Sequence, residues 1–253
     1  MKIGIKIGII GGSGLDDPKF LREFKEIDAN TKYGKPSSVL TVGKINNVDV
    51  VILARHGKNH TIPPSQVSYR ANISALKEQG CTHILATTAC GSLKREIQRG
   101  DLIILDQFID FTKQRKMTFY ETFEPHNPVH TAMADPFSED LRNVLIKTAK
   151  ELKLKFHPRG TVITIEGPRF STRAESKMFS QLGADVINMS ISTECILANE
   201  AKIPYAAIAI STDFDCIFTD IEPVTWEAIL KVFKENAEKV KSLLIKSIAN
   251  INR

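Results

Sequence analysis

Features of secreted, membrane and metal-binding proteins are scarce in this sequence. Its 253 residues include only four cysteines, which form no CxxC pair and have no histidine at metal-ligand spacing, so neither a zinc site nor a disulfide framework is expected. No stretch is long and apolar enough to span a bilayer, and charge interrupts the amino terminus before a signal peptide could form. We therefore expect a cytoplasmic protein with buried, inert thiols.

Strong charge imbalance, repeats and low-complexity linkers are also lacking. Lys and Arg exceed Asp and Glu by only 34 to 29, which suits a small anionic substrate but falls short of a nucleic-acid signature. The densest basic stretch, Lys-Gln-Arg-Lys at residues 113–116, is predicted to be a solvated loop. Because no break in composition divides the chain, we predict one domain over residues 1–253.

Short runs rich in β-branched residues alternate with amphipathic segments. The runs span residues 7–10, 48–54, 83–87, 102–105, 161–165, 186–189 and 205–210. This alternation predicts an α/β fold with a central mixed, largely parallel β-sheet flanked by helices. Asn46 and Asn47 separate residues 39–45 from the run at 48–54, which predicts one antiparallel hairpin within the sheet.

Helix signals accompany the amphipathic segments. Thr172 and Glu175 form a capping-box pair, and Ser138 can cap the amphipathic segment that follows it. Apolar residues from Trp226 to Leu244 recur at helical spacing. We expect this last helix to pack one face on the sheet.

Two acids follow one of the most apolar predicted strands. Asp213 and Asp215 come shortly after the run that ends at Ile210. A carboxylate is costly to bury without a partner, so this position predicts either a ligand that supplies donors or a carboxyl group that holds a proton. A surface turn with a helix-capping role is the alternative.

Polar side chains also follow other predicted strands. Ser13 lies in a glycine-rich turn that could cradle an anion, but the turn lacks the third glycine of a GxGxxG motif, which argues against a nicotinamide-dependent oxidoreductase. Arg55 and His56 could bind phosphate oxygens, or could instead pair with a local acid and a loop carbonyl. Thr88 and Ser190 follow two further runs. Such strand ends gather at one edge of an α/β sheet, which predicts one ligand site.

Six motifs between Ile7 and Asp215 occur in the order of a known family. They are Gly-Gly-Ser-Gly-Leu, Arg-His-Gly, Thr-Thr-Ala-Cys-Gly-Ser, Glu-Gly-Pro-Arg-Phe-Ser-Thr-Arg-Ala-Glu, Asn-Met-Ser and Thr-Asp-Phe-Asp. They resemble the trimeric nucleoside phosphorylases, most closely the branch acting on 5′-methylthioadenosine. The resemblance implies a mixed-sheet α/β fold, a homotrimer or a dimer of trimers, and cleavage of the purine–sugar bond by phosphate. It implies a small-molecule nucleoside and phosphate as substrates, with no metal, organic cofactor, nucleic acid or membrane.

The resemblance also assigns roles to single residues. Phosphate would be held by Ser13, Arg55, His56, Thr88, Ala89 and Ser190. Because glycosidic cleavage develops an oxocarbenium-like sugar, a fixed phosphate dianion would both stabilise that charge and attack it. The nucleoside would contact Phe170, Ser171, Asn188, Met189 and Thr212, with Met189 against the ribose and Phe170 against the base.

Recognition of the base falls to the acid pair. Asp213, carrying a proton, would donate to purine N7 and accept from the 6-amino group, with Asp215 as its support and partner in catalysis. Ser171 stands where relatives acting on 6-oxopurines carry a glutamate, and those relatives have an asparagine in place of Asp213. Both differences favour adenine.

Two departures from the family pattern concern the 5′ side of the sugar and the helix that follows Ser190. Trp226, Ile229 and Leu230 would face the 5′ group, with His130 reaching in from a neighbouring subunit, although relatives often carry a smaller aliphatic residue in place of Trp226 and core packing is the alternative for Leu230. Ser192-Thr193 replaces the usual Val-Pro, and we expect the helix there to form with a serine or threonine cap.

Two functional alternatives stay open. The protein could act more broadly on adenosine or on 6-oxopurine nucleosides such as inosine and methylthioinosine. It could also bind nucleosides without turning them over, because binding residues alone do not establish catalysis.

Overall fold

The computed structural model describes residues 4–11, 21–221 and 225–251. Along the chain the elements are β1 (Lys6–Gly11), β2 (Arg22–Ile27), β3 (Leu40–Ile45), β4 (Val48–Ala54), η2 (Pro64–Gln66), α1 (Tyr69–Glu78), β5 (His83–Ser92), β6 (Leu102–Ile104), β7 (Gln107–Phe111), α2 (Glu139–Glu151), β8 (Phe156–His157), β9 (Thr161–Ile165), α3 (Arg173–Gln181), β10 (Val186–Asn188), α4 (Ile191–Glu200), β11 (Tyr205–Asp213) and α5 (Trp226–Ile251).

Within the described residues the strands form one 11-stranded sheet, and this sheet is mixed, as predicted. Its main path runs β2-β3-β4-β1-β5-β10-β9-β7, while β11 pairs with β5 and β6, and β6 pairs with β8. Most pairings are parallel; β2/β3, β3/β4, β5/β10 and β6/β11 are antiparallel. The predicted hairpin is β3/β4, which turns at Asn46 and Asn47, both with positive φ.

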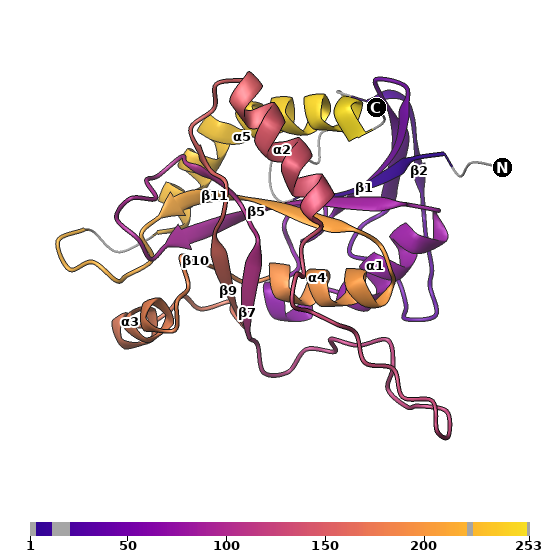
Figure 1. The fold of residues 1–253 in the computed structure, drawn as a ribbon, viewed down its shortest axis with the longest axis horizontal. Helices are drawn as coiled ribbons and strands as arrows, with labels where there is room; N and C mark the ends of the chain where they lie inside the picture. Colours follow the sequence, from indigo (N-terminus) through magenta and orange to yellow (C-terminus); the bar gives the residue numbers. More distant parts are fainter. Residues whose placement is uncertain (1–3, 12–20, 222–224, 252–253) are drawn as a thin grey trace.

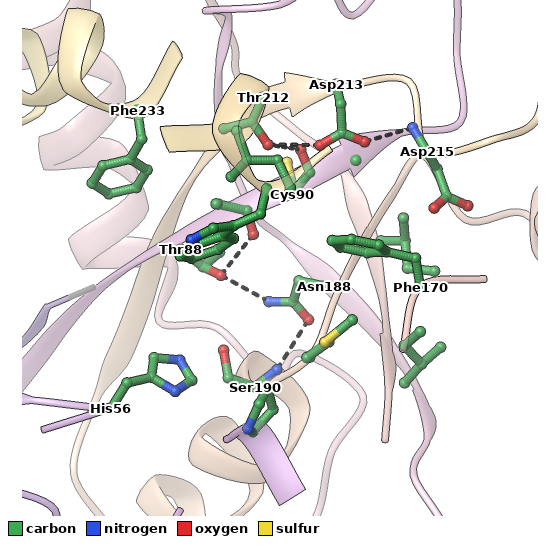
Figure 2. A pocket seen from close by; sticks show the side chains of 18 of the residues that line it. His56, Thr88, Cys90, Phe170, Asn188, Ser190, Thr212, Asp213, Asp215 and Phe233 are labelled. Carbon is green, nitrogen blue, oxygen red and sulfur yellow. Dashed lines mark hydrogen bonds between the residues drawn. The ribbon is translucent and has the colours of Figure 1, made fainter. Parts of the chain in front are cut away.

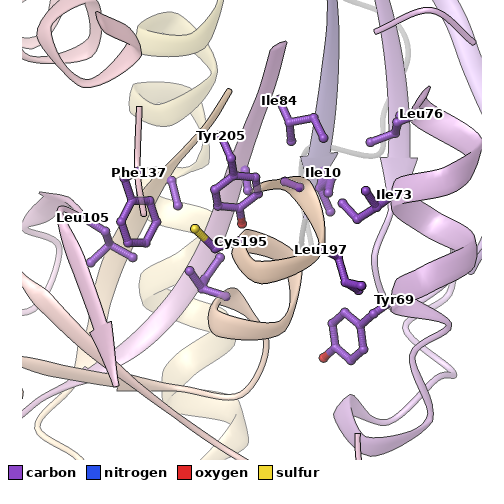
Figure 3. Packing of buried hydrophobic residues seen from close by; sticks show 14 of the residues in the cluster. Ile10, Tyr69, Ile73, Leu76, Ile84, Leu105, Phe137, Cys195, Leu197 and Tyr205 are labelled. Atoms are coloured by element: carbon purple, nitrogen blue, oxygen red, sulfur yellow. The ribbon is translucent and has the colours of Figure 1, made fainter. Parts of the chain in front are cut away.

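Helices cover both faces of the sheet (Figure 1). α2 and α5 pack together on one face, and α1 and α4 lie on the other. Successive β1 residues pack into hydrophobic clusters on opposite faces of the sheet. Ile9 belongs to the cluster that contains Phe233 and Val240 of α5, whereas Ile10 belongs to the cluster that contains Leu76 and Leu197 (Figure 3). A parallel strand buried on both sides needs apolar residues at every position, which explains the continuous runs in the sequence.

The predicted strands exist, but two continue into polar sequence. The runs at 48–54 and 161–165 match β4 and β9 residue for residue. β5 continues to Ser92, so Thr88 lies inside this strand. The prediction that Thr88 follows the strand is therefore wrong. β11 likewise ends on Asp213, whose backbone pairs with Gly91. The ladder between these strands continues where the apolar pattern stops, because neighbouring backbones supply its hydrogen bonds.

The helix caps agree in part with the sequence prediction. The Ser138 hydroxyl accepts from the Leu141 N–H, and the capping box of Thr172 is complete. α4 forms despite its missing Val-Pro, but the predicted serine or threonine cap is wrong, because no side chain caps its N-terminus. Ser192 Oγ instead donates to Asp110 Oδ1 at 2.9 Å.

The basic stretch at residues 113–116 is not a solvated loop throughout. The Arg115 side chain is only 2% exposed and ion-pairs with Glu166 at 3.1 Å. It also donates to the Tyr69 hydroxyl of α1 at 2.9 Å and to Thr193 Oγ1 of α4 at 3.3 Å. Partners this distant in sequence could not be inferred from local charge.

The structure also describes the cysteines and the helix lengths. All four cysteines are free, and Cys216 is half-buried while the other three are buried. Within the residues that the structure describes, no helix combines the length and apolar character needed to cross a membrane.

Candidate active site

One cavity opens where β4, β5, β10 and β11 end, beside the start of α5 (Figure 2). Fifteen of the predicted site residues line it: Arg55, His56, Thr88, Ala89, Phe170, Ser171, Asn188, Met189, Ser190, Thr212, Asp213, Asp215, Trp226, Ile229 and Leu230. Ser13 lies outside the described residues. His130 does not line the cavity; it sits on the exposed arm between β7 and α2, with its ring 5.7 Å from that of Phe123.

Arg55 follows β4 and is 1% exposed. Its Nε and Nη2 donate to the two carboxylate oxygens of Glu194 at 2.5 and 2.9 Å, and its Nη1 donates to the Thr87 carbonyl oxygen at 2.8 Å. The Tyr205 hydroxyl also donates to Glu194, at 2.8 Å. Burial alone would lower the pKa of Arg55, but the Glu194 carboxylate holds it above its usual range. Arg55 does pair with an acid, though one 139 residues away and not local.

His56 lies beside Arg55 at the same end of the cavity. Its Nδ1 is 2.9 Å from the Ile62 carbonyl oxygen, so the alternative of a loop carbonyl partner is also observed. Burial lowers the pKa of His56 to about 4, and the positive charge of Arg55 adds to this effect. The imidazole therefore lines the cavity as a neutral group at pH 7.

A hydrogen-bond chain links Thr88, Asn188 and Ser190, which all line the cavity (Figure 2). Asn188 Nδ2 donates to Thr88 Oγ1 at 3.3 Å, and Asn188 Oδ1 accepts from the Ser190 N–H at 3.4 Å. Thr164 Oγ1 in turn donates to Asn188 Oδ1 at 2.8 Å. The Asn188 amide is thus fixed in orientation, and it holds the polar groups of β5 and of the α4 N-terminus in register.

Asp213 occupies the opposite end, at an irregular point of the β5/β11 ladder. The register shifts between Ser211 and Asp213, and a bulge of this kind re-aims side chains next to active sites. Gly91 stands opposite, and a Cβ there would lie 2.9 Å from Asp213 Oδ1. A larger residue at position 91 would therefore displace the Asp213 carboxyl group from its observed place.

Both acids are nearly buried, and burial raises both pKa values. Thr212 Oγ1 and the Asp215 N–H donate to Asp213 at 2.8 and 2.7 Å, yet burial prevails and raises the pKa of Asp213 to about 6. Burial also raises the pKa of Asp215, against the opposing hydrogen bond from Ser176. The Ser171 side chain nearby also opposes the rise in the pKa of Asp215, and its buried hydroxyl makes no other hydrogen bond among the described residues.

Aromatic and apolar side chains line the cavity where α5 begins. The Trp226 ring lies 5.2 Å from His60, and the His60 ring stacks on His56 at 4.5 Å. Ile229 is buried within the wall formed by α5, whereas Trp226 is 44% exposed at its rim. Sequence reasoning missed His60, which no motif or periodicity marks.

The residues behind the cavity were also missed. Glu194 and Tyr205 fix Arg55, and Ser176 supports Asp215. The signal that could have revealed Glu194 is an acid among apolar residues of α4, because an acid buried there needs a charged partner. Among the described residues no cluster of His, Cys, Asp or Glu could hold a metal ion.

Known proteins resemble this chain over nearly its whole length. Residues 6–249 match the phosphorylase superfamily. The S-methyl-5′-thioadenosine phosphorylase of Danio rerio is 55% identical over 250 residues, which cover 98% of this chain and 89% of that protein. The S-methyl-5′-thioadenosine phosphorylase of Saccharolobus solfataricus is 51% identical over 241 residues, or 94% of this chain and 87% of that protein.

A solved structure shows the same fold. Methylthioadenosine phosphorylase from Schistosoma mansoni, in complex with adenine, superposes with a TM-score of 0.92 at 42% identity, covering 98% of this chain and 92% of that one. The chain therefore belongs to the phosphorylase superfamily and, within it, to the S-methyl-5′-thioadenosine phosphorylase family.

Proposed function

We propose that this protein cleaves 5′-methylthioadenosine with inorganic phosphate, releasing adenine and 5-methylthioribose 1-phosphate. It is thus a pentosyltransferase of purine and methionine salvage. One observation supports the reaction most directly: a single cavity has an arginine and a histidine at one end and two buried carboxyl groups at the other. The arginine and histidine end suits an anionic nucleophile, and the carboxyl end suits a leaving group that needs a proton.

At the first end, we assign phosphate to Arg55, His56, Thr88, the Ala89 backbone and Ser190. Arg55 brings a guanidinium whose orientation is held by Glu194, so little rearrangement is needed when an anion binds. Ser190 stands at the N-terminus of α4, where the helix dipole favours negative charge. Phosphate held there would attack the anomeric carbon while its charge stabilises the oxocarbenium-like sugar.

At the second end, we assign the purine to Asp213, Asp215, Ser171 and Phe170. A protonated Asp213 would donate to N7 as the base departs, and its raised pKa makes that protonated form accessible near neutral pH. The Ser171 hydroxyl lines the cavity and can rotate from Asp215 to donate to adenine N1. Phe170 is 40% exposed at the cavity wall, which leaves its face available to stack on the base.

The 5′ group would meet Trp226, Ile229 and Leu230, an apolar wall suited to a methylthio group. Adenosine is a second candidate substrate, because a solved relative from Schistosoma mansoni is named an adenosine/methylthioadenosine phosphorylase, and a mutant of that protein was solved in complex with methylthioadenosine. Acceptance of both nucleosides would mean that Trp226 contributes apolar contact without excluding a hydroxyl.

We further propose a homotrimer of single-domain subunits acting in the cytoplasm. The arm that carries His130 projects from the body of the protomer (Figure 1), and residues 121–132 are exposed on it. Phe123 and Val129 are large apolar side chains on this arm, 47% and 37% exposed. A neighbouring subunit would cover them and would receive His130 at its own 5′ pocket.

Incubation of the protein with 5′-methylthioadenosine, with and without phosphate, tests the reaction. Adenine quantified by chromatography should appear only with phosphate, together with a sugar phosphate. Adenine release that ignores phosphate would indicate a hydrolase, and binding without release would leave only a nucleoside-binding protein. Inosine tested in parallel should turn over poorly; efficient inosine cleavage would overturn the preference for adenine.

A further inference from the structure

The ring of His56 has one defined hydrogen bond to the protein backbone. Its Nδ1 lies 2.9 Å from the carbonyl oxygen of Ile62. A carbonyl oxygen only accepts hydrogen bonds, so Nδ1 carries the proton and Nε2 keeps a lone pair in the neutral ring. The tautomer of His56 is therefore set by the backbone.

Neighbouring groups keep this ring neutral. Burial lowers the pKa of His56 to about 4, Arg55, His60 and Arg115 lower it as well, and only the Ile62 carbonyl opposes them. His56 lines the cavity on the same side as Thr88 and Ser190 (Figure 2). At neutral pH its free nitrogen is thus an acceptor among groups otherwise suited to hold an anion.

We propose that His56 makes the site select a tetrahedral oxyanion that carries its own proton. This inference rests on the phosphate role proposed above. Monohydrogen phosphate can donate its O–H to Nε2 while its three bare oxygens meet the remaining donors. Monohydrogen arsenate has the same charge, shape and proton. Sulfate is also a tetrahedral dianion, but it would place a bare oxygen against the lone pair of Nε2, with no hydrogen bond for either atom.

The same bond would orient the nucleophile. With the protonated oxygen held at His56, an unprotonated oxygen faces the anomeric carbon and forms the new C–O bond. The C–N bond breaks, its electron pair goes to the purine, and the purine takes its proton from Asp213. The proton of phosphate stays on an oxygen that does not attack, so the nucleophilic oxygen needs no general base.

Competition between oxyanions tests the proposal with the unmodified protein. Phosphate and arsenate should both support adenine release, with KM values within several-fold of each other. Sulfate should compete with phosphate at a Ki at least about tenfold above the KM for phosphate. Equal affinity for sulfate and phosphate would overturn the role of His56 while leaving the proposed function intact. Absence of adenine release with either co-substrate would instead overturn the proposed function.

A variant and its control test whether His56 causes the difference in affinity between phosphate and sulfate. His56→Gln offers an amide that can donate to a bare oxygen, so the gap between sulfate and phosphate should shrink several-fold whatever happens to the rate. His60→Gln alters the ring stacked at 4.5 Å and leaves the Ile62 bond in place, so it should keep the gap. A gap unchanged in His56→Gln, or lost in His60→Gln alone, would contradict the proposal.

Calorimetry gives a readout that needs no variant. Phosphate binding would be titrated in buffers of different ionisation enthalpy, at a pH where free phosphate is the dianion. A neutral, accepting His56 takes up no proton on binding. Uptake of about one proton would mean that an imidazolium forms and donates to phosphate, which would overturn the proposal.

Discussion

The two ends of the cavity bury charge in opposite ways. At the proposed phosphate end, the guanidinium of Arg55 is 1% exposed and is neutralised by a two-bond pair with Glu194. At the proposed base end, Asp213 and Asp215 are 5% and 6% exposed, and in the part of the chain that the structure describes neither forms an ion pair. One end therefore holds a fixed charge, and the other holds carboxyl groups whose charge can change.

This difference matches the two halves of the proposed reaction. An anion-binding group works best when its own state does not change, and the Glu194 carboxylate keeps Arg55 charged. A proton donor must instead exist in both states near the working pH, and burial raises the pKa of Asp213 to about 6. The comparison predicts that variants at the two ends affect different kinetic constants.

The largest effect is expected from Asp213→Asn. An amide cannot supply a proton to N7, so kcat/KM should fall by about 10²–10⁴-fold. Its fold should persist, because the amide oxygen can accept from the Asp215 N–H and its nitrogen can donate to Thr212 Oγ1, whose hydroxyl can turn to Cys90 O at 3.2 Å. Steady-state kinetics with 5′-methylthioadenosine measures the loss.

Thermal unfolding supplies the control for this variant. Since the pKa of Asp213 is raised on folding, the native state binds more protons than the unfolded chain, and this group destabilises the protein as pH rises from about 4 to about 6. Asp213→Asn should therefore have an equal or higher Tm at pH 7. Asp49→Asn, at an exposed acid, should change neither property. Unchanged kcat/KM in Asp213→Asn would exclude Asp213 as the donor.

The next effect is the pH dependence at the base end. The protonated form of Asp213 is lost as pH rises through about 6, so kcat/KM for the nucleoside at saturating phosphate should fall by about tenfold per pH unit above that value. Asp213→Asn should lack this limb of the profile. A flat profile between pH 6 and 9 in the unmodified protein would contradict proton donation by Asp213.

A smaller effect is expected at the phosphate end from Glu194→Gln. The amide would present its NH₂ to the guanidinium, so Arg55 would lose one partner and its fixed orientation. KM for phosphate should rise by about tenfold while KM for the nucleoside changes little, and the free energy of unfolding should fall by about 3–5 kcal/mol. Equal increases in both KM values would indicate general loosening of the site.

Tyr205→Phe is the milder companion to this variant. It removes only the hydroxyl that donates to Glu194 at 2.8 Å, from a residue that contacts neither end of the cavity. Its loss of stability should be about 1–3 kcal/mol, and its rise in KM for phosphate should be smaller than that of Glu194→Gln. A larger rise would place the main support of Arg55 at Tyr205.

The sequence predicts the residues that line the cavity better than the residues that support them. Asp213 and Arg55 could be found because polar residues directly follow apolar strand sequence, and strand ends gather at one edge of an α/β sheet. Their supports could not, because Glu194 is 139 residues from Arg55 and only the folded chain brings the two together. Arg115 was misread as solvated for the same reason.

Edge strands were missed for a different physical reason. β2 is almost entirely exposed, so its sequence carries no apolar alternation, and β8 has only two residues. Backbone hydrogen bonds hold such strands to their neighbours whatever their side chains are. Strands with mostly buried residues, such as β4 and β9, were predicted to the residue because burial constrains most of their positions.

The smallest effect is expected at the rim between the two ends. Trp226 is 44% exposed and covers the sugar side through His60, so Trp226→Ala should remove apolar contact from the 5′ group. We expect kcat/KM for 5′-methylthioadenosine to fall by about five- to tenfold and that for adenosine to fall less, because a methylthio group has more apolar surface to lose. Trp226→Phe, which keeps an aromatic ring, should retain most of the preference. Neither variant should alter KM for phosphate, since Glu194, Thr87 and Tyr205, which fix Arg55, are not neighbours of Trp226. A change in KM for phosphate would mean that the rim is coupled to the His56 end through the stacked His60 and His56 rings.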